Sequence, residues 1–370
     1  MKKTLIASAI AAISFSGAVA AQATLNASEM AEQMDAMPQV YGNIQLAITH
    51  DSIDGGPSNV EHTDNGSTIG VKHEHMIASG ITGFFKAELE FDADNKSGNS
   101  GLDSFDEAYI GVKGDSFGQI WIGSDDSTYE RAVDEISNFW EVASLSLGGG
   151  YDTGEGDLVQ YMTPSFGGLT LGAAVQFNGD GEGTTQQFID NSDSANPVLA
   201  ERTVSGDKSY PYQLSAVYAV DALELAFAMD SNDGSTKYSS DAASANNENT
   251  YGVRASYNMD SLRVTGQVQT RKDVADTYGL MGVYTLGQNQ FALSYEVRNL
   301  DGVAKTAAGG EDTTDTISIQ ALRNVSDNLY VYAEGYIGGG DDVYEYTDSN
   351  GLDAVSNERT VAAIGATYYF

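Results

Sequence analysis

The chain has 370 residues, of which 53 are Asp or Glu and 18 are Lys or Arg, so its formal net charge is −35. A chain this acidic cannot bind nucleic acid by neutralising phosphates, and its surface attracts cations and repels anions. It has no cysteine, which excludes a disulfide framework. The 41 glycines, 21 tyrosines and only 5 prolines are unusual for a soluble enzyme and typical of a transmembrane barrel, where every second strand residue faces lipid.

Residues 1–23 predict a cleavable secretory signal. Two lysines near the start precede an apolar stretch over residues 5–19, and small-x-small cleavage sites follow at residues 18–20 and 21–23. A single membrane anchor is the alternative, but the apolar run is short and no positively charged flank follows it. We therefore expect the mature chain to function outside the cytoplasm.

Residues 24–39 do not fit the strand pattern that follows them. Met30, Met34 and Met37 are helically spaced and Pro38 would end a helix, yet about ten residues are too few for a stable isolated helix. The segment is expected to be a frayed leader, or a short helix that docks in a pore mouth or against another subunit. No later run approaches the ~20 apolar residues that a membrane helix needs.

Residues 40–370 predict an all-β fold, a transmembrane antiparallel barrel. Apolar and polar residues alternate with a period of two, as where Leu293 and Tyr295 alternate with Ser294 and Glu296. Short turns and longer polar loops alternate along the chain, which is typical of outer-membrane barrels and gives sixteen strands. A soluble β-sandwich or a parallel β-helix is the alternative, but sandwich loops need not sort into short and long on alternate sides.

The connections fall into two length classes. The short turns are expected at residues 78–80, 115–118, 166–168, 221–222, 260–261, 287–289 and 326–328. The longer connections are expected at residues 51–66, 94–104, 124–157, 179–209, 232–248, 274–276, 301–315 and 339–356. An even number of strands places both chain ends at the rim with the short turns.

The third long loop, residues 124–157, carries most of the candidate functional residues. Ser127 and Glu130 form a Ser-x-x-Glu capping box, which predicts a short helix over residues 128–139. One side of this helix would carry Ala132, Val133, Ile136 and Phe139 and could pack on the inner barrel wall. The acidic residues expected to face water are Asp125, Asp126, Glu130, Asp134, Glu135, Glu141 and Asp152.

The barrel region resembles the Gram-negative general porins. The resemblance rests on Ser-Thr-Ile-Gly-Val-Lys at residues 67–72, Ala-Tyr-Ile-Gly-Val-Lys-Gly at 108–114, Ile-Trp-Ile-Gly at 120–123, Pro-Ser-Phe-Gly-Gly at 164–168 and the closing Ala-Thr-Tyr-Tyr-Phe. It implies a homotrimer of 16-stranded barrels in the outer membrane of a Gram-negative bacterium, with the third loop folded into each lumen as a constriction. It also implies a water-filled channel for passive diffusion of small hydrophilic solutes and ions.

The resemblance further implies partners for assembly and residence in the membrane. Tyr368 and Phe370 would form the terminal signal that the barrel assembly machinery reads, and outer-membrane lipid and lipopolysaccharide would surround the barrel. The expected organisation is therefore a signal over residues 1–23, a leader over 24–39 and a porin domain over 40–370.

The expected lumen departs from the family pattern in its charge. Asn43, Thr68 and Asp106 occupy positions where general porins usually carry basic residues. Basic residues remain at lumen parity, namely Lys72, Lys86, Arg254, Arg263, Arg271 and Arg298. The lumen balance is acidic, which predicts a preference for cations. Neutralising Glu130, Asp134 and Glu135 together is expected to weaken this preference with little loss of stability, because exposed carboxylates contribute little to folding.

Two other functions stay open. A substrate-specific porin for a sugar, oligosaccharide or peptide would use aromatic residues in the lumen, and Tyr330, Tyr332 and Tyr336 share the inner parity of one strand. A surface adhesin or phage receptor would use the long loops. No catalytic constellation is evident, so we expect no enzyme activity, cofactor or metal. His73 and His75 share a strand face and could together bind a metal ion. A position at the membrane interface explains these two histidines better.

Overall fold

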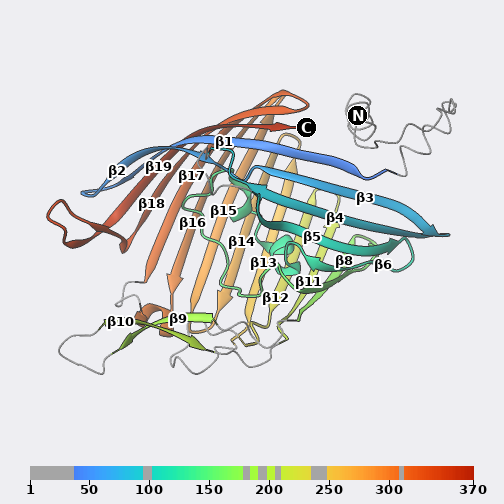
Figure 1. The fold of residues 1–370 in the computed structure, drawn as a ribbon, viewed down its shortest axis with the longest axis horizontal. Helices are drawn as coiled ribbons and strands as arrows, with labels where there is room; N and C mark the ends of the chain where they lie inside the picture. Colours follow the sequence, from blue (N-terminus) through green and yellow to red (C-terminus); the bar gives the residue numbers. More distant parts are fainter. Residues whose placement is uncertain are drawn as a thin grey trace, which may run out of the picture.

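The structure is a computed structural model that describes residues 37–94, 102–177, 184–190, 198–204, 210–234, 248–307 and 312–370. The predicted signal and most of the predicted leader lie outside these residues. Within them, seventeen strands form one antiparallel sheet that closes on itself, because the first strand pairs with the last (Figure 1).

The strands of this sheet are β1 (Gln39–Ile53), β2 (Ser58–Asp64), β3 (Thr68–Ala78), β4 (Ile81–Phe91), β5 (Leu102–Gly114), β6 (Gly118–Ser124), β7 (Leu158–Met162), β8 (Leu169–Gln176), β11 (Tyr212–Val220), β12 (Leu223–Asp230), β13 (Thr250–Met259), β14 (Leu262–Arg271), β15 (Ala275–Leu286), β16 (Asn289–Leu300), β17 (Thr313–Ser326), β18 (Leu329–Thr347) and β19 (Asp353–Tyr369). A separate hairpin of β9 (Thr184–Asp190) and β10 (Val198–Val204) lies within the long connection between β8 and β11.

Two of the seventeen segments share one place in the barrel. β2 and β3 both pair with β1, one with its second half and the other with its first. Between them the Asp64 carboxylate accepts hydrogen bonds from the backbone N–H groups of Gly66 and Ser67, at 2.9 and 2.7 Å, and this local turn interrupts the ladder. The described residues therefore form a 16-stranded barrel, as the sequence predicted.

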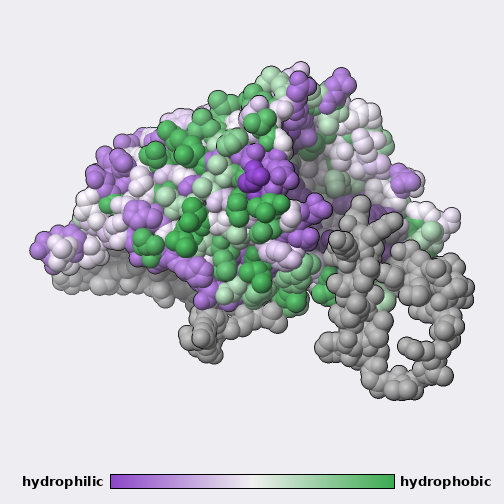
Figure 2. Space-filling view, turned by 90° about the horizontal axis from the view of Figure 1, so that it is seen from above, coloured by the Kyte–Doolittle hydropathy of each residue, from purple (hydrophilic) through white to green (hydrophobic). Residues whose placement is uncertain are grey.

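The strands bury their polar face and expose their apolar face, the reverse of the arrangement in a soluble protein. On β16, Leu293 is 57% exposed while its neighbours Ser294 and Glu296 are 1% and 0% exposed. The same alternation holds along β13, β15 and β17, where polar side chains face the interior, and apolar side chains gather in patches on the visible outer wall (Figure 2). This arrangement suits a barrel that has lipid outside and water inside. Within the described residues, no helix is long and apolar enough to cross a membrane.

The seven predicted short turns are confirmed, since each lies between paired neighbouring strands. Two predicted loops were largely wrong. Residues 51–66 and 339–356 are mostly strand, because β1 and β2 continue as a hairpin with its tip at residues 54–57, and β18 and β19 continue to residues 347 and 353. The prediction failed because it took polar composition as a sign of a loop. Strands that extend past the membrane are hydrated on both faces and are therefore polar too. Arg359 pairs with Asp51 across these extensions.

The barrel closes through the end of the chain. The Gly42 N–H donates to the Phe370 carbonyl at 3.2 Å, and the Phe370 N–H donates back to the Gly42 carbonyl at 3.0 Å. A Cβ added at Gly42 would lie 2.6 Å from the Phe370 ring and 2.5 Å from the Thr68 carbonyl oxygen. Glycine is therefore required here by the close approach of the last strand and the ring that ends it.

We predict that Gly42→Leu weakens this closure by roughly 1–3 kcal/mol, the usual cost of overpacking. The measurement is the midpoint of thermal unfolding of the detergent-solubilised barrel, followed by its heat-dependent shift on an electrophoresis gel. Gly282→Leu is the matched control, because a Cβ there meets nothing within 4 Å. Equal midpoints for the two variants would contradict the role of this seam.

Candidate functional site

The segment between β6 and β7, residues 124–157 and hereafter loop 3, crosses the interior of the barrel. Its backbone N–H groups donate to inward side chains of three distant strands. The Tyr129 N–H donates to Gln213 on β11 at 2.9 Å, and the Ile136 N–H donates to Gln267 on β14. The Ala143 N–H donates to the Tyr336 hydroxyl on β18 at 3.0 Å. The predicted inward fold of this loop is confirmed (Figure 1).

The loop begins with the predicted cap, but its helix is shorter than predicted. The Ser127 hydroxyl accepts from the Glu130 N–H at 3.2 Å, and α3 (Thr128–Val133) follows. A 3-10 turn, η1 (Ser137–Phe139), replaces the second half of the expected helix over residues 128–139. The break has a tertiary cause, since the Ile136 N–H donates to Gln267 Oε1 on the barrel wall, at 3.2 Å, instead of to a helical carbonyl.

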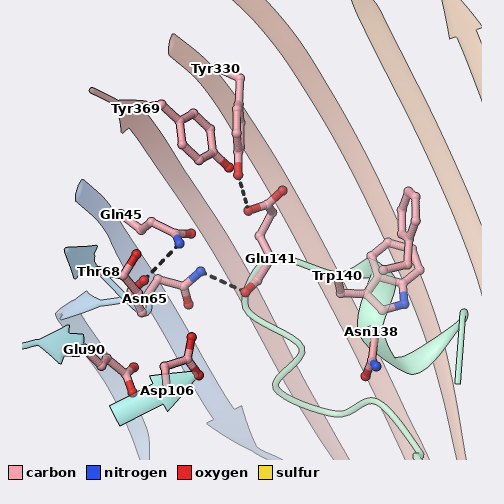
Figure 3. A pocket seen from close by; sticks show the side chains of 12 residues that line it. Gln45, Asn65, Thr68, Glu90, Asp106, Asn138, Trp140, Glu141, Tyr330 and Tyr369 are labelled. Carbon is pink, nitrogen blue, oxygen red and sulfur yellow. Dashed lines mark hydrogen bonds between the residues drawn. The ribbon is translucent and has the colours of Figure 1, made fainter. Parts of the chain in front are cut away.

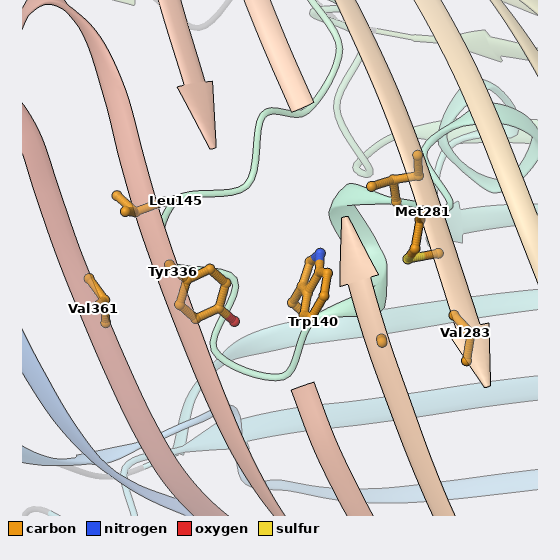
Figure 4. Packing of buried hydrophobic residues seen from close by; sticks show 8 residues of the cluster. Trp140, Leu145, Met281, Val283, Tyr336 and Val361 are labelled. Carbon is orange, nitrogen blue, oxygen red and sulfur yellow. The ribbon is translucent and has the colours of Figure 1, made fainter. Parts of the chain in front are cut away.

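The apolar side of the loop packs against the wall. Ala132, Val133 and Ile136 are buried as predicted, against β11–β13 and β15. Trp140 and Leu145 were missed by the sequence analysis, although they join Ile136, Met281 and Tyr336 in one cluster (Figure 4). The alternation of Ser and Leu over residues 144–147 was a signal for Leu145, whereas nothing in the local sequence marks Trp140.

Glu135 fixes the middle of loop 3 to the same wall. One of its oxygens accepts from Arg263 Nε and Thr265 Oγ1, both at 2.7 Å, and the other pairs with Arg254 and with Arg263 Nη2. Burial alone would raise the pKa of Glu135, but the hydrogen bonds from Arg263 and Thr265 and the two guanidinium charges outweigh it, so the pKa is lowered. The carboxylate is therefore ionised when the loop is docked.

Other acidic residues of the loop are also held by the barrel. Asp152 pairs with Arg271 at 2.5 Å, and the side chain of Asp134 accepts from Gln269. Burial raises the pKa of Asp134 despite that hydrogen bond. Asp125 accepts from Trp121 Nε1 at 2.6 Å and pairs with Arg131.

These contacts correct the expectation that the acidic residues of loop 3 all face water. Asp125 and Asp134 are buried, Glu135 and Asp152 are ion-paired, and Glu130 and Glu141 are only half-exposed, whereas Asp126 is exposed. The expectation that neutralising Glu130, Asp134 and Glu135 together costs little stability is wrong for the same reason. The wall arginines lie directly behind the loop, not across the passage from it.

The predicted basic residues divide into two groups. Arg254, Arg263, Arg271 and Arg298 contact loop 3, the last through the Gly148 carbonyl. Lys72 and Lys86 lie on β3 and β4, where their ammonium groups are 4.7 and 5.8 Å from the centre of the Tyr41 ring. Lys86 also pairs with Glu107 and, at 3.7 Å, with Glu88.

A cavity of about 400 Å³ lies between loop 3 and the wall formed by the first strands (Figure 3). It is hereafter called the eyelet cavity. The residues that line it are Gln45, Asn65, Gly66, Thr68, Glu90, Asp106, Asn138, Phe139, Trp140, Glu141, Tyr330 and Tyr369. Three of these are carboxylates, and no described lining residue is basic.

One contact that bounds this cavity was not predicted. Asn65 Nδ2, in the break between β2 and β3, donates to the Glu141 carbonyl at 2.8 Å, so loop 3 touches both sides of the barrel. Thr68 and Asp106, two of the positions where basic residues were missing from the expected pattern, both line the cavity. Asn43 lies beside it and donates to Thr68 Oγ1 at 3.0 Å.

A family model for Gram-negative porins matches residues 7–342. The chain belongs to this family. This porin is also similar to proteins named monosaccharide porin from Halomonas sp and major outer membrane protein from Halomonas elongata. Each is 29% identical over the full length of both chains. A major outer membrane protein from Pasteurella multocida is 28% identical over 49% of this porin and 50% of that protein.

Solved structures with the same fold include an anion-selective porin from Comamonas acidovorans, with a TM-score of 0.62 and 15% identity over 90% of this porin and 99% of that chain. A Salmonella typhi OmpF complex with daunomycin has a TM-score of 0.64 and 16% identity over 90% and 97%. The resemblance to general porins is thus confirmed, and this porin is an outer-membrane β-barrel channel.

We predict that Glu135→Gln loosens loop 3, because it removes one of the two carboxylates, Glu135 and Glu224, that Arg254 and Arg263 share, and the only one of the two that lies on the loop. The free energy of unfolding should fall by roughly 2 kcal/mol, less than the ~3–5 kcal/mol of a fully buried pair because Glu135 is partly hydrated. Single-channel current in a planar bilayer should show more frequent fluctuation between levels. Asp126→Asn removes an exposed charge from the same loop and should leave the current steady. Equal current noise in both variants would contradict the role of Glu135 in holding the loop to the wall.

Proposed function

We propose that this porin is a passive diffusion pore for small hydrophilic solutes and ions that prefers cations. The observation that supports the preference is the eyelet cavity, where Glu90, Asp106 and Glu141 meet and no described lining residue is basic. The arginines of the lumen do not offset these charges from across the passage, because Arg254 and Arg263 are engaged by Glu135 behind loop 3.

Fixed carboxylates at a narrow aqueous passage create a negative potential. Salt screens such a potential over about 8 Å near physiological ionic strength, so a passage of comparable or smaller radius stays partly unscreened. A cation in transit is stabilised and an anion is destabilised. No bond is made or broken, and selectivity follows from size and charge alone.

The proposed assembly is a homotrimer in the outer membrane, exported by the signal over residues 1–23 and surrounded by lipid and lipopolysaccharide. Tyr368 and Phe370 are proposed as the signal for the barrel assembly machinery. Both are exposed on the outer face of the last strand, at 52% and 44%. An external factor can therefore reach these side chains while the seam is still open.

A monosaccharide is a second candidate solute. Tyr330, Tyr369 and Trp140 bring aromatic rings to a cavity that also has the side-chain amides of Gln45 and Asn65. Aromatic faces beside a few polar groups are typical of sites for small ligands. The relative named monosaccharide porin supports this candidate, which is compatible with cation preference because both concern the same passage.

The preference is tested by the zero-current potential across a potassium chloride gradient. The unaltered porin should favour potassium, and the triple variant Glu90→Gln, Asp106→Asn, Glu141→Gln should lose most of that preference while keeping side-chain size. Glu345→Gln, Asp348→Asn, Asp353→Asn is the control, with the same charge change at the hairpin between β18 and β19. Chloride preference in the unaltered porin, or equal effects of both triple variants, would overturn the proposal.

The preference should also depend on pH through Glu130. Burial, together with the charges of Asp126 and Glu155, raises the pKa of Glu130 to about 7, although a hydrogen bond from Asn138 opposes the shift. A raised carboxyl pKa means that the negative charge is present above pH about 7 and lost below it, so potassium preference should fall on acidification through that value.

The measurement is the zero-current potential on either side of that pKa. Glu130→Gln should flatten the profile near pH 7, because the variant has no carboxyl to titrate there. Asp348→Asn should not flatten it, because backbone and Asn350 hydrogen bonds lower the pKa of Asp348 and keep it ionised throughout. A profile that Glu130→Gln leaves unchanged would show that another group titrates.

A further inference from the structure

The eyelet cavity has carboxylates on two opposite sides. Glu141 extends from loop 3, and Glu90 and Asp106 extend from β4 and β5 across from it (Figure 3). A volume of about 400 Å³ is larger than a bare ion requires and lies in the range of sites for small organic ligands. The charge pattern favours a ligand with at least one positive group.

Glu141 is held in place before any solute arrives. Its backbone N–H donates to Glu334 Oε1 at 2.9 Å, and its carbonyl accepts from Asn65 Nδ2 at 2.8 Å. One side-chain oxygen accepts from the Tyr330 hydroxyl at 2.7 Å. Two anchors on β18 and one in the break between β2 and β3 hold Glu141, so a ligand that meets its carboxylate loses little of its binding free energy to ordering the site.

Aromatic rings lie next to this carboxylate. Tyr330 and Tyr369 have ring centres 6.0 Å apart, and Phe139 and Trp140 form an edge-to-face pair at 5.2 Å. All four line the cavity. Ring faces attract organic cations, and they also cover the apolar parts of a ring-shaped solute.

Trp140 adds a group that calls for an acceptor. Its side chain is almost fully buried, with 4% exposed, and its indole N–H makes no hydrogen bond to any other described residue. Buried donors are usually paired, and an unpaired one asks for an explanation. A hydroxyl oxygen of a solute in the cavity would supply an acceptor, which neither a metal ion nor a simple ammonium ion can do.

We propose that the eyelet cavity binds small hydroxylated organic cations, with a protonated amino sugar as the representative ligand. The ammonium group would lie at Glu141, with Glu90 and Asp106 across the cavity adding to the negative potential, the ring against the tyrosines, and a hydroxyl at Trp140. This inference rests on the proposed passage of small hydrophilic solutes and adds the chemical class that the cavity retains longest.

The experiment uses three monosaccharides of matched ring size and different charge. Glucosamine, glucose and glucuronate are added in turn to the porin in a planar bilayer that carries a potassium current, at neutral pH, where most of the amine is protonated. Glucosamine should reduce the current saturably, with half-block at a concentration at least about tenfold below that for glucose, or ~1.4 kcal/mol. Glucuronate should have the weakest effect.

Variants separate the groups that make the site. Glu141→Gln should bring the half-block concentrations of glucosamine and glucose together, because it removes charge but keeps an acceptor for Tyr330. Trp140→Phe should weaken both sugars alike, because it removes the N–H donor together with part of the ring and leaves the carboxylates in place. Glu345→Gln and Tyr278→Leu, at the outer hairpin and on the lipid face, are the matched controls and should change neither value.

The outcomes are distinguishable from those that test the pore itself. A porin that prefers potassium but shows equal half-block for glucosamine and glucose, or only a linear loss of current with glucosamine, overturns the amino-sugar site and leaves the proposed function standing. Chloride preference in the same bilayers overturns the proposed function. Glucosamine selectivity that survives Glu141→Gln also overturns this site, because its charge recognition would then lie elsewhere.

Discussion

The bilayer allows no unpaired backbone groups within its apolar core, and the rest of this structure depends on that constraint. Sixteen strands satisfy this constraint only because β1 pairs with β19, which leaves the sheet without an open edge. The seam uses the last residue of the chain, whose backbone and ring both meet Gly42. Closure in turn fixes which side chains face lipid and which face water, since neighbours on a strand point to opposite sides.

Once the ring is closed, its interior is lined largely by polar side chains. Loop 3 crosses this interior and binds to one part of the wall. The loop contributes carboxylates and apolar residues, and β13–β15 contribute Arg254, Arg263 and Met281. Docking thus pairs opposite charges on one side, whereas the carboxylates of Glu90, Asp106 and Glu141 meet at the eyelet cavity on the other.

The same contacts explain why charge counting along the sequence is a poor guide to selectivity. Glu135 and Arg263 cancel each other behind the loop, whereas Glu90 and Glu141 come together from segments far apart in the chain. The barrel fold accommodates either sign of preference, because it prescribes only that the lumen is polar. In the proposed function, the side chains on the free face of loop 3 and on the strands opposite it decide which ions pass.

The resemblance to general porins predicted which loop enters the lumen, and the sequence by itself determined the barrel, its strand number, its short turns and the cap of α3. These features are local: a period of two, a turn between two strands, or a Ser127 hydroxyl three residues before the N–H it caps. Two polar connections were misjudged because strands beyond the membrane lose the alternation on which the prediction relied.

Only the tertiary structure decided where helix α3 ends, which acidic residues are buried and where the open passage lies. Gln267 accepts the hydrogen bond of the Ile136 N–H, which is therefore not helical. Arg254 and Arg263 form ion pairs with Glu135, and Asn65 donates a hydrogen bond to the Glu141 carbonyl. Each contact joins residues more than seventy positions apart. Their meeting depends on barrel closure and loop docking, so no local pattern could contain it.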